Sequence, residues 1–395
     1  MRKWGLVLCC VVVMLGVVSL NPLLAQAPKE LKIGFIAPLS GPAAPWGITW
    51  LRGVEMAIKD INGAGGMNVK GQAYLLKVIS EDDKYNPALT TNAAHRLIDE
   101  HGVKFIHGSI TSPGAIATST VSEPAKVIIM VGGAAKNRLG PEKPFTFCIH
   151  VGHSEQAFTA YPWVAKAFPK IKTVASIQPN DETGQAYVEM VTPLYSGLGW
   201  TSASVEYYER GTKDFYPLLG KVLPKNPDFV NLSGNPAGTI GLIVKQAREL
   251  GYKGVMMATG AVDADTLMKV APAQALEGFI SDSMTIPGPH LFPAEEKFYQ
   301  RYMKEYGPPW QALAIDSYDG TMMLKKAIEQ VGSVTDTPAI RDVFANMTYE
   351  GIRGKVFYGG EKTYGIKRQL ATDFVLSIFR NGKPENTVRI NGMVP

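Results

Sequence analysis

Small, hydroxyl-bearing loops hold the residues of this chain best suited to bind a polar ligand. The stretch 107–114 (HGSITSPG) carries Thr111 and Ser112, and the stretch 132–135 (GGAA) is glycine-rich backbone. A serine hydroxyl and the unpaired N–H groups at a helix start can hold a carboxylate or a similar polar head, because the helix dipole is positive there. Serine is also a favoured helix N-cap, so Ser112 fits either a ligand contact or a plain cap.

Trp46 is the largest side chain in the Gly/Pro-rich stretch 33–47 (IGFIAPLSGPAAPWG). This stretch begins in an apolar run, and a helical pattern follows it. A loop so rich in glycine and proline contributes little core. The indole therefore either faces a ligand cleft or packs on the surface and caps the following helix.

Enzyme, cofactor and metal motifs are weak in this sequence. The glycines of 234–241 are spaced G-x-x-x-G-x-x-G, which is not the dinucleotide-binding spacing, and no G-x-S-x-G, G-x-x-x-x-G-K-[ST] or H-E-x-x-H occurs. His150 and His153 stand close together, but no further ligand has metal-site spacing. Cys148 fits a buried structural thiol better than a nucleophile. We expect neither catalysis nor a cofactor or metal ion.

Alternating apolar runs and amphipathic stretches must position these loops. Short apolar runs closed by polar, glycine or proline residues predict strands at 31–37, 74–79, 103–106, 127–131, 173–177, 204–208, 229–232, 255–258, 356–358 and 373–379. Helical patterns are expected after Asn86-Pro87 and at 183–196, 215–222, 239–250, 294–306, 312–331 and 338–344. Strands with helical crossovers predict parallel sheets, whose ligands bind beyond the carboxyl ends of the strands.

The length of the chain and its N-terminal stretch limit which classes of protein it can belong to. A chain of 395 residues exceeds the roughly 250–300 that one core supports, so two domains are expected, joined near 147–151. Residues 1–27 have a basic start, an apolar run and the small residues Ala25 and Ala27, which is typical of a cleaved signal peptide rather than a membrane anchor. The exported remainder keeps one cysteine, Cys148, so it has no internal disulfide.

The charge balance excludes an obvious nucleic-acid surface. The formal net charge is +5, and loss of Arg2 and Lys3 with the leader lowers it by two. Nucleic-acid binding would need clustered lysines and arginines. We therefore expect a soluble, exported protein whose partners do not include nucleic acid.

Five segments in register resemble the Leu/Ile/Val-binding branch of the type I periplasmic solute-binding proteins. They are LKIGFIAPLSGP, GVEMAIKDINGAGG, EDDKYNPALTTNAAHRLI, IVKQARELG and the helix around Asp316. The resemblance implies an α/β fold of two Rossmann-like lobes with parallel sheets, joined by a three-crossing hinge. It places lobe 1 at 28–149 and 283–350, and lobe 2 at 150–282 and 351–395.

The same resemblance implies a function without catalysis or cofactor. Proteins of this branch are periplasmic receptors that close on a small-molecule ligand and deliver it to an ABC permease and its ATPase. We expect a monomer. A sensory receptor for a signalling partner would use the same fold and the same residues, so transport and sensing both stay open.

The family's pocket can be carried over residue by residue. Trp46 falls where the family places an aromatic residue over the ligand's side chain, and Ser112 falls at the hydroxyl that holds a carboxylate. Thr183 occupies a position in lobe 2 where many relatives have tyrosine. The candidate ligand-binding residues are Trp46, Thr111, Ser112, Gly133, Ala134, Ala135, Thr183, Asn235, Gly260 and Asp316.

Two departures from the family pattern bear on the ligand. Gly260 stands where amino-acid-binding relatives have an acidic residue that pairs with the ligand ammonium, although Asp263 or Asp265 could replace it after a shift of register. Ala135 stands where a threonine is usual. A buried ammonium without a carboxylate partner is costly. We therefore expect a carboxylate with an apolar or aromatic body, with a branched-chain or other amino acid as the alternative.

Overall fold

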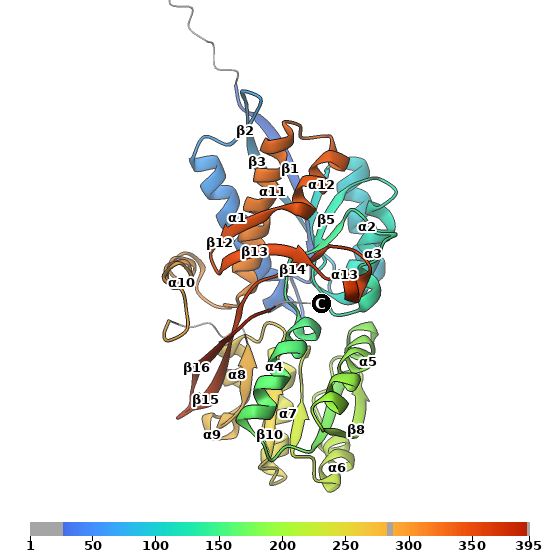
Figure 1. Ribbon diagram of the computed structural model, residues 1–395, viewed down its shortest axis with the longest axis vertical. Coiled ribbons are helices and arrows are strands. Elements are labelled where there is room, and N and C mark those ends of the chain that lie inside the picture. The colour runs from blue at the N-terminus through green and yellow to red at the C-terminus, as the bar shows by residue number, and fades with distance from the viewer. Residues whose placement is uncertain (1–26, 283–286, 393–395) are drawn as a thin grey trace, which may run out of the picture.

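The computed structural model describes residues 27–282 and 287–392. The predicted signal peptide, 1–27, lies outside these residues apart from Ala27. Figure 1 shows two lobes stacked along the long axis of the molecule. Among the described residues, no helix is both long enough and apolar enough to span a bilayer.

Lobe 1 is built on a nine-stranded sheet with the order β12-β13-β14-β6-β5-β4-β1-β3-β2. The strands β1, β3, β4, β5, β6 and β14 pair in parallel, and β2, β12 and β13 add antiparallel partners at the two edges. The strands are β1 (Lys29–Ala37), β2 (Met67–Val69), β3 (Gln72–Asp82), β4 (Phe105–His107), β5 (Ile128–Val131), β6 (Thr146–Cys148), β12 (Thr348–Gly351), β13 (Gly354–Gly359) and β14 (Gln369–Ala371).

Lobe 2 is built on a seven-stranded sheet with the order β16-β15-β11-β10-β9-β7-β8. Its central strands are parallel, whereas β15 runs antiparallel to both β11 and β16. The strands are β7 (Thr173–Pro179), β8 (Thr201–Tyr208), β9 (Phe229–Asn231), β10 (Val255–Ala258), β11 (Ile280–Asp282), β15 (Phe374–Arg380) and β16 (Lys383–Ile390). Both sheets are therefore mixed but mainly parallel, which confirms the predicted α/β class.

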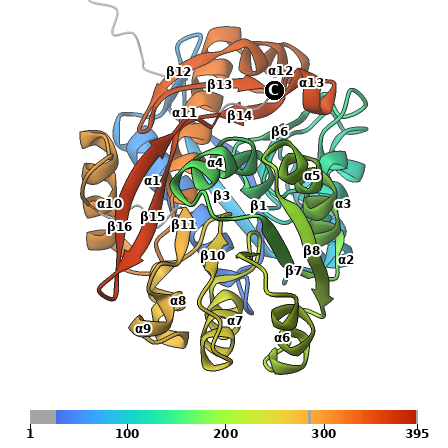
Figure 2. The same cartoon turned by 60° about the horizontal axis from the view of Figure 1, so that its bottom comes forward.

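Helices cover the sheets of both lobes, as Figures 1 and 2 show. Those of lobe 1 are α1 (Ala44–Gly63), α2 (Pro87–His95), α3 (Ser112–Ser122), α10 (Pro293–Tyr306), α11 (Leu313–Val331), α12 (Thr337–Asn346) and α13 (Glu361–Tyr364). Those of lobe 2 are α4 (His153–Ala167), α5 (Glu182–Gly197), α6 (Tyr216–Val222), α7 (Ala237–Glu249), α8 (Ala264–Val270) and α9 (Ala273–Leu276).

Local sequence accounts for where several of these helices begin. The Asn86 side chain accepts hydrogen bonds from the N–H groups of Ala88 and Leu89, and Pro87 occupies the first turn of α2. Asp181 caps α5 in the same way through the N–H groups of Thr183 and Gly184. The sequence predicted the α2 start at Asn86-Pro87, and the structure confirms it.

The chain passes between the lobes after β6, after β11 and after β14. The predicted division gave all of 351–395 to lobe 2, but β13 and β14 pair within the sheet of lobe 1. The last passage therefore lies between Ala371 and Phe374. The prediction differs because the sequence of these strands shows only that they are apolar. It does not show which sheet they join, since their pairing depends on strands far away in the sequence.

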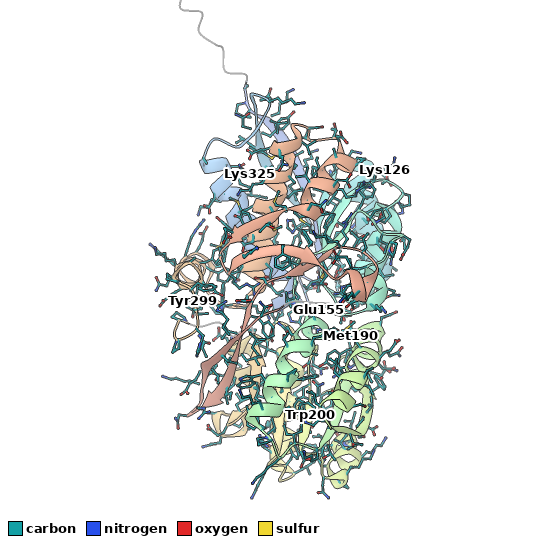
Figure 3. All side chains as sticks on the ribbon, viewed as in Figure 1. Lys126, Glu155, Met190, Trp200, Tyr299 and Lys325 are labelled. Atoms are coloured by element: carbon teal, nitrogen blue, oxygen red, sulfur yellow. The ribbon has the colours of Figure 1, made fainter. Side chains whose placement is uncertain are left out.

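A buried ion pair ties the lobes together beside the first passage. Arg138, in the loop after β5, pairs with Glu155 in the first turn of α4 at 2.6 Å, and both side chains are fully buried. Figure 3 labels Glu155 at the end of α4 that meets lobe 1. The same guanidinium donates to Gln369 and lies against the Tyr364 ring, so it joins three segments of the chain.

Candidate ligand-binding site

An inner cavity lies between the lobes at the carboxyl ends of the parallel strands. Its volume is about 30 Å³, enough for one or two water molecules, so the lobes are closed around it. Both lobes contribute to its wall, which consists of Trp46, Tyr85, Ile110, Thr111, Ser112, Gly133, His150, Gly152, His153, Thr183, Gly234, Gly260, Ala261 and Leu313. Six of the ten candidate residues from the sequence are in this wall, namely Trp46, Thr111, Ser112, Gly133, Thr183 and Gly260.

Trp46 joins the two lobes at the cavity. Helix α1 begins at Ala44, so the indole belongs to the first turn of a helix and not to the loop before it. The side chain is only 9% exposed, and its Nε1 donates a 3.0 Å hydrogen bond to the carbonyl oxygen of Ala261 in lobe 2. The ring therefore forms part of the cavity wall and holds the closed arrangement.

Tyr85 makes a second bridge between the lobes. Its hydroxyl lies 3.0 Å from the Thr183 hydroxyl and accepts a 2.6 Å hydrogen bond from Arg210, whose guanidinium also lies over the Tyr85 ring. Arg210 is in turn paired with Asp181, the cap of α5. Tyr85 also borders an outer cavity of about 430 Å³, so its side chain separates the inner cavity from the outer one.

Ser112 connects two of the loops that the sequence singled out. Thr111 caps α3 by accepting from the Gly114 N–H, so Ser112 is not the cap. The Ser112 Oγ instead accepts hydrogen bonds from the N–H groups of Ala134 and Ala135, at 2.8 and 3.1 Å. Its two lone pairs are then in use, and the hydroxyl proton remains to be donated.

His150 lines the cavity and bonds Asp316, which does not itself line it. The His150 Nδ1 lies 2.8 Å from an Asp316 oxygen, and Asp316 is also ion-paired with Arg353. Burial, with a smaller opposing effect of Asp282, lowers the pKa of His150 to about 4. The imidazole is therefore neutral at neutral pH, and Asp316 orients it.

Gly260 offers no side chain, and His153 fills the adjoining space. A Cβ added at Gly260 would lie 2.9 Å from the His153 Nδ1, and the φ of +106° disfavours any other residue. Asp263 caps α8 through the Thr266 N–H, and Asp265 borders a different cavity. Neither carboxylate belongs to the inner cavity wall.

Four candidates stand outside the wall formed by the described residues. The backbone N–H groups of Ala134 and Ala135 donate hydrogen bonds to the Ser112 hydroxyl. The Asp316 carboxylate bonds His150, and it is His150 that lines the cavity. The Asn235 side chain is used within lobe 2, where it donates to the carbonyl oxygens of Ile177 and Leu232.

Tyr85, His150 and His153 were not among the ligand-binding candidates, although all three line the cavity. Tyr85 follows strand β3, so the rule that ligands meet the carboxyl ends of strands could have found it. The two histidines follow β6, a three-residue strand that the sequence pattern does not reveal, and their spacing in the sequence suggests only a weak metal pair. Among the described residues, no three His, Cys, Asp or Glu side chains cluster as a metal site would require. Cys148 is a buried free thiol whose pKa burial raises.

Comparison with known proteins identifies the family. A sequence model described as periplasmic binding protein matches residues 30–372. The chain belongs to the periplasmic binding protein family. Within that family, this periplasmic binding protein falls in the Leu/Ile/Val-binding branch of the type I fold, whose members are substrate-binding proteins of ABC transporters and not enzymes.

Several relatives cover most of the chain. The Leu/Ile/Val-binding protein homolog 3 of Brucella melitensis biotype 1 is 26% identical over 319 residues, 80% of this chain and 83% of the relative. The leucine-binding protein LivK of Thermotoga maritima has a TM-score of 0.78 at 24% identity, covering 91% of this chain and 99% of LivK. A solute-binding protein of R. palustris in complex with benzoate has a TM-score of 0.75 at 18% identity, covering 91% and 96%. The two structures have the same fold as this chain.

Proposed function

We propose that this periplasmic binding protein receives a small carboxylate with an apolar or aromatic body, rather than an α-amino acid. One observation carries the proposal: none of the described residues in the inner cavity wall is Asp or Glu. An α-ammonium group enclosed there would lose its water without gaining a carboxylate partner. Leaving a buried charge unpaired in this way is strongly unfavourable.

Helix N-termini around the cavity favour an anionic group. Trp46, Ser112, His153 and Thr183 stand in the first turns of α1, α3, α4 and α5 respectively. The N-terminus of a helix carries a partial positive charge and unpaired N–H groups. A carboxylate can therefore be held by these helix ends and by the Ser112 hydroxyl, without a lysine or arginine in the wall.

Apolar side chains complete the wall and suit a hydrocarbon body. Trp46 and Ile110 come from lobe 1 loops and first turns, Leu313 comes from α11, and Ala261 faces them from lobe 2. The R. palustris protein of the same fold was solved with benzoate, which supports an aromatic acid as one member of this ligand class. Because the inner cavity holds only one or two water molecules here, its wall must expand to admit a ligand of the size of benzoate.

The proposed mechanism is closure of the lobes around the ligand. Following the sheets, we assign residues 28–149 and 287–371 to lobe 1, and residues 150–282 and 374–392 to lobe 2. Ligand binding stabilises the closed arrangement that Trp46 and Tyr85 bridge. The protein, exported as a monomer to the periplasm, then presents its ligand to an ABC permease driven by its ATPase.

Thermal unfolding and calorimetric titration with benzoate and leucine test the ligand class on the exported protein. We expect benzoate to raise the unfolding temperature and leucine to leave it unchanged. Ser112→Ala should weaken benzoate binding, whereas Ser119→Ala in the same helix, whose hydroxyl donates to the Ile116 carbonyl oxygen, should not. Stabilisation by leucine but not by benzoate would overturn the proposal and favour an amino-acid receptor.

A further inference from the structure

His153 is a buried polar side chain without a complete set of partners, and it forms part of the inner cavity wall. It is the first residue of α4 and is 7% exposed. Its Nε2 has no hydrogen-bond partner among the described residues. A buried nitrogen left unpaired destabilises the ligand-free protein, whereas a bound ligand can satisfy it.

Two glycines make room for the His153 ring. A Cβ at Gly234 would lie 2.6 Å from Nε2, and a Cβ at Gly260 would lie 2.9 Å from Nδ1, both closer than real Cβ contacts. Both glycines have positive φ, +81° and +106°, which other residues rarely adopt. The Tyr187 ring, 4.9 Å away between centroids, packs against the imidazole from within lobe 2. The position of the ring is thus fixed by its surroundings.

The ring carries no charge at neutral pH. Burial, reinforced by the nearby His150 and Arg138, lowers the pKa of His153 to about 3. A neutral imidazole can form a hydrogen bond with a ligand oxygen, but it cannot neutralise an ammonium as a carboxylate does. Its chemistry therefore matches an uncharged or anionic ligand group.

We propose that His153 determines ligand specificity in this cavity by forming a hydrogen bond from its imidazole Nε2 to an oxygen atom of the bound molecule. This inference rests on the proposed function and deepens it. The histidine occupies the space into which a side chain at position 260 would project. It thereby replaces a charged contact with a neutral one and disfavours ligands that would place an ammonium group at this position.

The test compares His153→Phe and His153→Gln with the wild-type protein, using benzoate and leucine as probes. Phenylalanine keeps a ring between the two glycines and against Tyr187 but removes Nε2, whereas glutamine keeps a polar donor. We expect His153→Phe to weaken benzoate binding by about tenfold, the usual effect of losing one buried hydrogen bond, and His153→Gln to weaken it less. The unfolding temperature of ligand-free His153→Phe should equal or exceed that of wild type, because the unpaired nitrogen is gone.

A purely structural histidine would give the opposite pattern, with a lower unfolding temperature and an unchanged affinity. Benzoate affinity within twofold of wild type in His153→Phe overturns the inference. If leucine proves to be the ligand of the wild type, the proposed function fails, and so does the selection against α-amino acids. Unchanged leucine affinity in His153→Phe would then overturn the hydrogen bond from Nε2 as well. His95→Phe, at an exposed histidine on α2, serves as the control for the substitution itself.

Discussion

The indole Nε1 of Trp46 in lobe 1 donates a 3.0 Å hydrogen bond to the carbonyl oxygen of Ala261 in lobe 2. Both residues line the inner cavity, so the contact that joins the lobes is also part of the proposed ligand site. Such a bond exists only while the lobes are closed. Ligand affinity should therefore depend on it, even where the ligand does not touch the indole nitrogen.

Trp46→Phe should weaken benzoate binding by about tenfold, because it removes the bond to Ala261 while keeping an aromatic ring in the wall. Trp46→Ala should weaken binding further, since it also removes the ring. Calorimetric titration measures both affinities. Trp163→Phe, a half-buried position on α4 outside the cavity wall, is the control. Equal affinities for wild type and Trp46→Ala would mean that the indole contributes nothing to binding.

Tyr85→Phe should accelerate ligand release. The substitution keeps the ring beneath Arg210 but removes the hydroxyl that meets Thr183 and Arg210 across the cleft. These bonds are made in the closed state, so their loss should raise the dissociation rate about five- to tenfold and change the association rate little. Stopped-flow tryptophan fluorescence with benzoate follows both rates. The control is Tyr216→Phe, because the hydroxyl of Tyr216 bonds Glu249 on the exposed face of lobe 2; a dissociation rate that changes equally in both variants would contradict the prediction.

Glu155→Gln should destabilise the protein by about 3–5 kcal/mol, because it leaves the fully buried Arg138 guanidinium without its carboxylate. Urea unfolding of the ligand-free protein measures the change in the free energy of unfolding. The control is Glu329→Gln, which removes the partly exposed pair of Lys325 and Glu329 on α11 and should cost less than about 1 kcal/mol. Comparable losses in the two variants would show that burial of the Arg138 pair does not matter.

Acidification below about pH 6.5 should destabilise the folded protein, because buried histidines take up protons only on unfolding. Burial lowers the pKa of His107 and His153 to about 3 and that of His150 to about 4, from 6.5. Between those values and 6.5 the unfolded chain binds more protons, so the free energy of unfolding falls by about 1.4 kcal/mol per pH unit for each histidine. Burial raises the pKa of Asp319 to about 7, so between about pH 4 and 7 the folded protein binds more protons at this group than the unfolded chain does. In that range Asp319 offsets the destabilisation caused by one of the three histidines.

His107→Gln tests this pH dependence away from the ligand. His107 is buried between Trp50 and Thr321 and is not in the cavity wall. Urea unfolding between pH 4 and 6 should show a slope smaller by about 1.4 kcal/mol per pH unit than in wild type. An unchanged slope in His107→Gln would contradict the assignment of His107 as a neutral buried histidine.

Local patterns were sufficient to predict much of the fold. The apolar runs at 31–37, 127–131, 173–177 and 255–258 match strands of the two mainly parallel sheets to within two residues at either end, and Asn86-Pro87 marks the start of α2. These signals are readable because burial, strand period and helix capping act over a few residues. The strands β2, β6, β11, β12, β14 and β16 were not predicted, because none of them stands out as an apolar run: five have only three or four residues, and β16 is mainly polar.

The candidate site, too, was predictable from the sequence only in part. By itself the sequence determined the fold class, the family branch, the loops at the strand ends and the absence of an acid at Gly260. Only the tertiary structure decided that Thr111, not Ser112, caps α3, that Asp316 acts through His150, and that the His153 ring occupies the space beside Gly260. The reason is physical, because these contacts join residues from different loops and from both lobes. The pattern of residue types along the chain does not determine which of these side chains meet when the lobes close.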